Sequence, residues 1–136
     1  MNRLNSADLA SFQRKYRFAG GRVRRLRVRY PANGPPTIEF TLSVRTALKD
    51  LGTDAKPIRL RFRLTEAEEF RFQKRPGVPG GKVAEARFGY FDGLFFVNLD
   101  AFGLQPGEVP MAHDFRASDA YVAARELNWE EVQAKS

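Results

Sequence analysis

Segments that alternate apolar and polar residues with a strict period of two constrain the fold of this chain more than any other feature. The alternation runs through 37–46 and 57–64, and a third run covers 22–30. Because successive side chains of a β-strand point to opposite faces, each run predicts a strand with one buried face and one solvent-exposed face. Val23 is out of phase with its run, which predicts a β-bulge near Arg24.

The stretch 83–101 predicts a β-hairpin. Its centre is Asp92-Gly93, a pair that suits a two-residue type I′ turn. Such a turn places six apolar residues on one face, which pair as Tyr90 with Phe95, Phe88 with Val97 and Ala86 with Leu99. We therefore expect Phe88, Tyr90, Phe95 and Val97 to be buried together.

The other face of this hairpin is also apolar near its tip. It carries Phe91, Leu94 and Phe96 beside Arg87 and Asn98. A contiguous apolar patch of this kind usually marks a contact, so we expect another layer of the fold or a second subunit to cover it. If the fold leaves these residues bare, Phe91, Leu94 and Phe96 are the candidate contacts of a homodimer.

Helical signals are scarce. We expect a short helix at 6–15, where Leu9, Phe12 and Tyr16 have helical spacing, and a single helical turn at 65–68. The segment 118–135 is ambiguous between strand and helix. We expect a strand through about Leu127, followed by a helical or frayed tail.

The length and the breaks in the pattern indicate one domain. A chain of 136 residues supports one core, and the Pro/Gly-rich stretch 75–82 reads as a long loop between strands of that core. The stretch 31–36 reads as a turn. We expect a mainly β domain over residues 1–136, an antiparallel sandwich or strongly bent sheet of about seven strands with a short N-terminal helix. A helical C-terminal segment would make the class α+β.

The chain has no cysteine and one histidine, which removes several chemistries together. Disulfides, thiolate catalysis and cysteine-ligated zinc are excluded, as are metal motifs with two histidines. No apolar run approaches the roughly 18 residues of a membrane span, and the first residues contain no apolar signal core. We expect a cytoplasmic protein with no cofactor and no membrane partner.

The candidate catalytic features lack the groups that their chemistry needs. His113 has no identifiable nucleophile or orienting group, so we expect a loop histidine without a catalytic role. Gly81-Lys82 is followed by Val83, where a phosphate-binding P-loop has Ser or Thr. No pair of carboxylates stands out. We expect no enzyme, and keep a catalytic cleft with His113 or two carboxylates as a third class of function.

The arginines form the most regular charged pattern. The net charge is +7, with +11 in residues 1–75 and −4 in residues 76–136. On the predicted strands, the residues opposite the core stripes are Arg25, Arg27, Arg29, Arg59, Arg61 and Arg63. If the two strands share a sheet, these six guanidinium groups share its outer face, with Glu39, Thr41 and Ser43 between them. The pattern fits either a solvated strand surface or an anion-binding face.

Three sequence features carry a resemblance to a known group of proteins. They are Phe18-Ala19-Gly20-Gly21, the hairpin tip 90–96, and the closing stretch from Ser118-Asp119-Ala120-Tyr121 through Asn128-Trp129-Glu130. Over roughly residues 18–131 the chain resembles small β-rich bacterial proteins of immunity-protein or uncharacterised type from polymorphic toxin loci. The resemblance implies a non-catalytic, partner-binding role and a terminal strand at 119–127.

These observations predict a non-enzymatic protein-binding module, of immunity type if the resemblance holds. Its basic face would bind an acidic protein such as an acidic toxin. The alternative is a basic nucleic-acid-binding domain. The aromatic residues of these strands alternate onto the other face, which disfavours stacking with single strands and leaves contacts with duplex phosphates.

Overall fold

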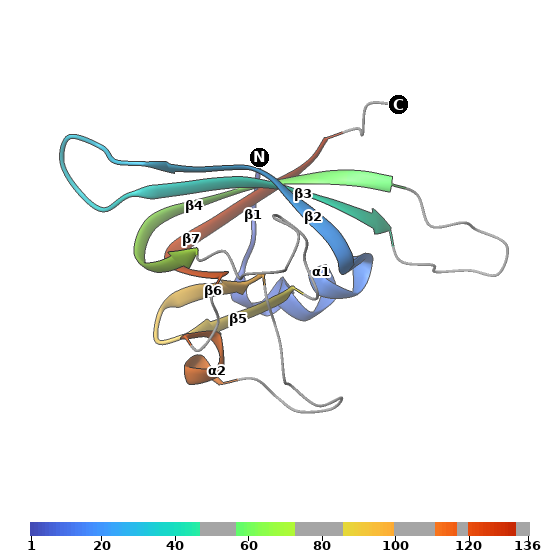
Figure 1. Cartoon of the computed structure of the whole chain (residues 1–136). Coiled ribbons are helices and arrows are strands. Elements are labelled where there is room, and N and C mark those ends of the chain that lie inside the picture. Colours follow the sequence, from blue (N-terminus) through green and yellow to red (C-terminus); the bar gives the residue numbers. More distant parts are fainter. Residues whose placement is uncertain (47–56, 73–85, 100–110, 117–119, 133–136) are drawn as a thin grey trace, which may run out of the picture.

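The computed structural model describes residues 1–46, 57–72, 86–99, 111–116 and 120–132, and its strands form one curled antiparallel sheet (Figure 1). The two α-helices among these residues are short. In chain order the elements are β1 (Asn2–Arg3), the 3-10 helix η1 (Ser6–Asp8), α1 (Leu9–Lys15), β2 (Tyr16–Arg29), β3 (Thr37–Thr46), β4 (Pro57–Phe72), β5 (Arg87–Phe91), β6 (Leu94–Asn98), α2 (Ala112–Arg116) and β7 (Ala120–Val132).

The sheet contains seven strands within the described residues. Their order is β2-β3-β4-β7-β6-β5, and β1 adds to β7 beside β6. The expected fold class, a mainly β chain with a strongly bent antiparallel sheet and a short N-terminal helix, is confirmed. The ambiguous C-terminal segment is a strand through Val132. The helical or frayed tail expected after Leu127 is therefore wrong for residues 128–132.

The sheet curls because β4 bends sharply in its middle. Glu66 has a positive φ of 55°, and the β4–β7 register shifts by one residue between Ala67 and Glu69. Leu64 and Ala67 both enter the core although they are three residues apart. The helical turn expected at 65–68 is therefore wrong: the break in alternation marks a bend with a bulge, and the strand continues on both sides of it.

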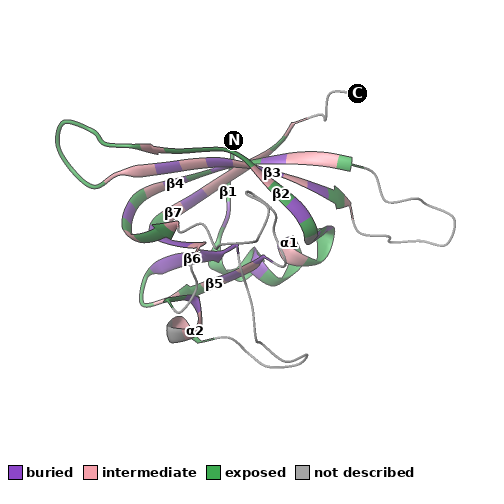
Figure 2. Cartoon of the chain, in the orientation of Figure 1, coloured by how far each residue is buried: buried purple, intermediate pink, exposed green. Residues whose placement is uncertain are grey.

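The concave inner face holds the main core. Buried and partly exposed residues alternate along β3 (Figure 2), as its sequence predicts. α1 closes this face with Phe12, which is 2% exposed. The Phe12 ring lies 4.9–6.1 Å, centroid to centroid, from the rings of five residues, which are Tyr16, Phe18, Phe62, Phe88 and Trp129. The short helix is thus anchored to strands from both halves of the sheet.

The β5–β6 hairpin has the register that its turn predicts. Tyr90 pairs with Phe95 and Phe88 with Val97, around a turn in which Asp92 and Gly93 have positive φ. Phe88, Phe95 and Val97 are buried as expected. Tyr90 is 43% exposed, and its expected burial is wrong, because it lies next to the tip of the hairpin where the core ends.

The second apolar face of this hairpin is covered by α2. The Phe115 ring lies 5.6 Å from the ring of Phe96 and 5.7 Å from that of Phe91. Leu94 is 7% exposed and Phe96 1%, whereas Phe91 is partly exposed. The expected cover is a layer of the same chain, so these residues need no second subunit to bury them. The proline- and glycine-rich stretch 75–82 lies outside the described residues.

Candidate partner-binding face

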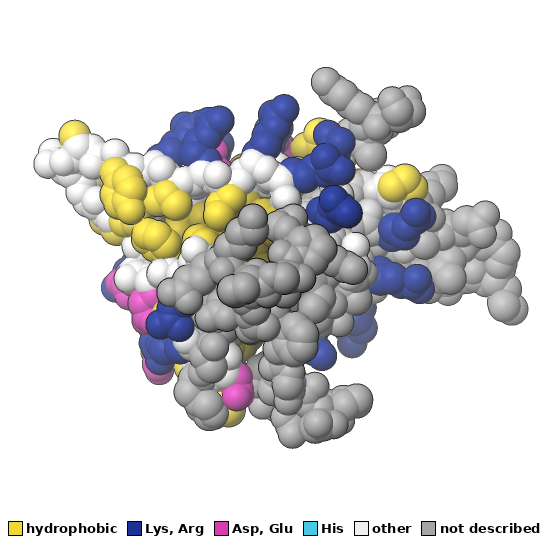
Figure 3. All heavy atoms as spheres, viewed as in Figure 1, with side chains coloured by type: hydrophobic (Ala, Val, Ile, Leu, Met, Phe, Trp, Pro, Cys, Tyr) yellow, Lys and Arg dark blue, Asp and Glu magenta, His cyan; other side chains and the backbone are white. Residues whose placement is uncertain are grey.

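β2, β3 and β4 carry a surface of arginines on the outer face of the sheet, away from α1. The inner rows of β3 and β4 are buried, which identifies the alternate residues as the outer rows. Across β2, β3 and the segment 57–64 of β4 that pairs with β3, these rows contain nine arginines, which are Arg17, Arg22, Arg24, Arg27, Arg29, Arg45, Arg59, Arg61 and Arg63. We call these nine, with the β3 residues between them, the arginine face. Its basic side chains gather along the top of the molecule in Figure 3.

β3 separates the arginines of β2 from those of β4. The register places Ser43 between Arg22 and Arg59, Thr41 between Arg24 and Arg61, and Glu39 between Arg27 and Arg63. Because neighbouring strands are about 4.8 Å apart, the two arginine columns are roughly 9.6 Å apart. The sharing of one sheet and the intervening position of the β3 residues agree with the sequence-based expectation.

One of the six predicted arginines leaves this face. Arg24 pairs with Thr41 and Arg27 with Glu39, so Arg25 and Leu26 together lie opposite the inward-facing Phe40. This is the bulge that Val23 predicts, and Arg25 has the positive φ of a bulge residue, 54°. The placement of Arg25 in the outer row is therefore wrong.

The bulge also changes the membership of both rows of β2. It brings Arg22 and Arg24 onto the arginine face. The out-of-phase Val23 predicts the bulge, whereas this exchange follows from the pairing with β3. On the inner side, Val28 packs against the core, whereas Leu26 is 40% exposed and Tyr30 is 73% exposed. The buried stripe expected at Leu26, Val28 and Tyr30 is thus only partly formed.

Two glutamates neutralise part of the arginine face. Glu39 lies 3.1 Å from Arg63 and 3.5 Å from Arg29, and it is the single acidic residue in the outer rows of β2, β3 and the segment 57–64 of β4 that pairs with β3. Glu130 of β7 lies 3.0 Å from Arg61. These pairs are exposed, and each contributes roughly 0–1 kcal/mol to stability.

The remaining charge is a surplus of cations. Within the described part of the chain, Arg17, Arg22, Arg27 and Arg59 have no carboxylate within ion-pair distance, and Arg24 donates a 2.6 Å hydrogen bond to the hydroxyl of Ser43. Guanidinium groups bind carboxylates and phosphates with two parallel hydrogen bonds. The free arginines of this face are therefore available to an anionic partner.

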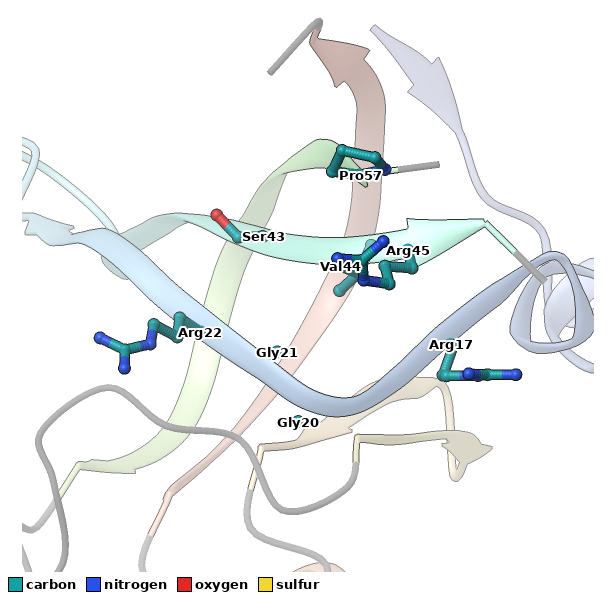
Figure 4. A pocket seen from close by; sticks show the side chains of 8 residues that line it. All are labelled: Arg17, Gly20, Gly21, Arg22, Ser43, Val44, Arg45 and Pro57. Carbon is teal, nitrogen blue, oxygen red and sulfur yellow. The ribbon is translucent and has the colours of Figure 1, made fainter. Parts of the chain in front are cut away.

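A shallow pocket of about 250 Å³ interrupts the arginine face where β2 loses its register with β3. Gly20 has a φ of +80°, and a Cβ on Gly21 would lie 2.6 Å from the carbonyl oxygen of Ser43, so both positions need glycine. Figure 4 shows the guanidinium groups of Arg17 and Arg22 pointing in opposite directions along β2. The pocket is a gap in the face and has no convergent anion-binding geometry.

A second polar cluster lies beyond the bend of β4. Arg116 of α2 donates two 2.9 Å hydrogen bonds to the two carboxylate oxygens of Glu69, and the hydroxyl of Tyr121 donates another at 3.2 Å. The hydrogen bonds from Arg116 lower the pKa of Glu69, and burial beside this carboxylate raises the pKa of Tyr121. The cluster fastens α2 to the sheet. Its members are distant in sequence, and no local motif marks it.

Tyr16 forms a similar link between β2 and β7. Its hydroxyl donates a hydrogen bond to the carboxylate of Glu131. Burial of the phenol raises its pKa, and the hydrogen bond to Glu131 adds to this effect. The phenol therefore stays protonated and joins the two strands.

Three remaining observations concern the position of His113, metal ligands and membrane-spanning helices. His113 lies within α2 rather than in the expected loop. In the described ranges, no three His, Asp or Glu side chains gather as a metal site would require. Neither helix among these residues has the length and apolar character needed to cross a membrane.

Comparisons of the chain with models of known protein families, with curated proteins and with solved structures find no match. The geometry and charge of the arginine face are therefore the features that point to a function.

Proposed function

We propose that this chain is a non-enzymatic protein-binding module that binds an acidic partner protein through the arginine face. The observation that carries the proposal is the charge imbalance of the outer rows of β2, β3 and the segment 57–64 of β4, where nine arginines accompany one glutamate. The resemblance to immunity proteins suggests an acidic toxin as the partner and the cytoplasm as the setting.

The second candidate is binding to duplex nucleic acid. The same arginines would contact phosphates, with a steep dependence on salt. The outer rows of these three strands contain no aromatic side chain, so the face has no platform on which single-stranded bases would stack. Duplex DNA is therefore the competitor that the test includes.

The test reverses two arginines that have no ion-pair partner among the described residues. In Arg27→Glu/Arg59→Glu we expect the affinity for a labelled oligoglutamate peptide to fall at least tenfold, because four units of charge change on the face. The matched control is Arg14→Glu/Lys15→Glu, which makes the same change in net charge on exposed positions of α1. Fluorescence anisotropy at two salt concentrations measures both variants, with duplex DNA as a second probe.

Three outcomes decide between the candidates. A loss of peptide affinity in Arg27→Glu/Arg59→Glu but not in the control variant, with a native melting curve, supports the proposal. An equal loss of peptide affinity in both variants would show that only net charge matters. It would refute specific binding through the arginine face. Tight, salt-dependent binding of duplex DNA without binding of the acidic peptide would replace the proposal by the second candidate.

A further inference from the structure

The two outermost strands of the sheet, β5 and β2, differ in whether a side chain hydrogen-bonds to the backbone groups of their outer edges. β5 has five residues, and the side-chain amide of Gln13 donates to the carbonyl of Phe88 and accepts from its backbone N–H, both at 3.3 Å. This amide imitates a neighbouring strand and caps the β5 edge. β2 has fourteen residues and pairs only with β3, and within the described residues no such cap lies along it. An exposed edge of this length is a template for pairing with another chain.

The free edge of β2 is amphipathic. Its outer side carries Arg22, Arg24, Arg27 and Arg29, all exposed. Its inner side carries the half-exposed Leu26, the partly buried Val28 and, just after the strand, Tyr30. In Figure 3 apolar side chains surface below the arginines on this flank of the molecule. A strand added here would need acidic and apolar residues in alternation.

We propose that the edge of β2 binds an extended acidic segment of the partner as an additional strand of the sheet. Pairing is centred on Arg27 and Arg29, because the bulge at Arg25 interrupts the edge before them. Acidic side chains of the added strand face the arginines, and apolar side chains between them cover Leu26 and Val28.

The charge of the edge selects this occupant over a second copy of the chain. Two β2 strands placed side by side would bring arginines opposite arginines, and like charges across a strand pair are destabilising. An acidic strand converts the same contacts into ion pairs. The inference rests on the proposed function, because it specifies how the acidic partner binds.

The experiment compares three synthetic peptides of identical composition in glutamate and valine. One alternates the two residues, one has them in blocks, and one alternates them with N-methyl groups on every second amide. We expect the alternating peptide to bind at least tenfold more tightly than the other two, and to protect backbone amides of β2 from hydrogen exchange. N-methylation leaves the charge unchanged and removes strand hydrogen bonds.

Two single reversals locate the binding site. Arg59 lies on β4, roughly 16 Å from Arg27 by strand geometry, and it also has no carboxylate partner in the described ranges. We expect Arg27→Glu to lower the affinity for the alternating peptide at least tenfold. We expect Arg59→Glu to change that affinity less than threefold.

The failures of the two proposals are distinguishable. Equal binding of the alternating and N-methylated peptides, or equal effects of the two reversals, would overturn edge pairing while leaving the arginine face as a binding surface. Self-association of the chain through β2 would also overturn it. Absence of binding by every acidic probe would overturn both proposals.

Discussion

Glu39 offers the sharpest test of the arginine face, because its removal should strengthen binding while it weakens the fold. Its carboxylate lies between Arg29 at 3.5 Å and Arg63 at 3.1 Å, and its side chain is 19% exposed. Glu39→Gln keeps the shape of the side chain and removes the charge. Both arginines then become available to an anionic partner.

The structure sets the magnitude of both effects. A ligand carboxylate in contact with Arg29 or Arg63 lies roughly 7 Å from the Glu39 carboxylate, a repulsion of about 0.6 kcal/mol in water before screening. Relief of that repulsion strengthens binding about twofold per contacting carboxylate at low salt, and about 1.5-fold at 0.15 M. Loss of the two exposed ion pairs lowers the free energy of unfolding by about 0.5–1 kcal/mol.

The assay titrates oligoglutamate into Glu39→Gln and into Glu68→Gln. The second variant is a matched control, because Glu68 pairs with Arg125 at 2.7 Å beyond the bend of β4 and away from the arginine face. Both variants raise the net charge by one unit. Tighter binding in Glu39→Gln alone supports this role of Glu39. Equal affinities in the two variants, or weaker binding in a Glu39→Gln variant that still unfolds cooperatively, would refute it.

Three further predictions concern the fold that presents this face. Phe12→Ala removes a buried ring with five aromatic neighbours, so we expect urea denaturation to show a loss of about 3–5 kcal/mol of unfolding free energy. Gly21→Ala should lower the melting temperature more than Gly20→Ala, because the first adds a clash with the β3 backbone and the second only a dihedral strain of about 1–2 kcal/mol; an equal drop would contradict the clash. Arg116 lowers the pKa of Glu69, so this carboxylate stabilises the fold above its unfolded pKa near 4.5, and that contribution is lost as the pH falls through the lower folded pKa. Melting temperatures in acidic buffers should therefore depend less on pH in Glu69→Gln.

Local alternation predicted the parts of the structure in which one strand residue follows another without a break. The inner and outer rows of β3 and of the first half of β4 follow from period two alone, and the register of the β5–β6 hairpin follows from Asp92-Gly93. In each case a local rule determines which face a side chain takes. Nothing distant along the chain has to be known.

The sequence-based predictions are wrong where a single residue shifts the phase of the period-two alternation. The out-of-phase Val23 indicated a bulge, yet its consequence, the exchange of Arg25 for Arg22 and Arg24 on the outer face, follows only from the pairing with β3. Glu66 has a positive φ that no local sequence signal predicts. The residues around it, 65–68, have the spacing of a helix capping box, which led to the incorrect prediction of a helical turn. The strand β7 was ambiguous by propensity, and the ladder with β4 decides its structure.

The contact between Glu69, Arg116 and Tyr121 lay beyond local reasoning for a different reason. Arg116 and Tyr121 lie 47 and 52 positions after Glu69, and they meet it only because α2 packs on the second face of the hairpin. Each alone is an ordinary surface residue. Tertiary packing alone brings this charged pair together. Its members form no local sequence motif, so the sequence does not predict the contact.

The crowding of nine arginines on one face is tolerated because the other face of the same strands is deeply buried. The inner rows of β3 and β4 contain six residues that are 0–1% exposed, which are Ile38, Phe40, Leu42, Leu60, Phe62 and Leu64. Burial of each such side chain is worth about 1.5–3 kcal/mol, whereas a like-charge pair across strands costs some tenths of a kcal/mol. The core therefore outweighs the repulsion many times over, and charge reversals of the arginines that are unpaired within the described residues should alter binding far more than folding. This separation makes the charge reversals proposed above interpretable as changes in recognition.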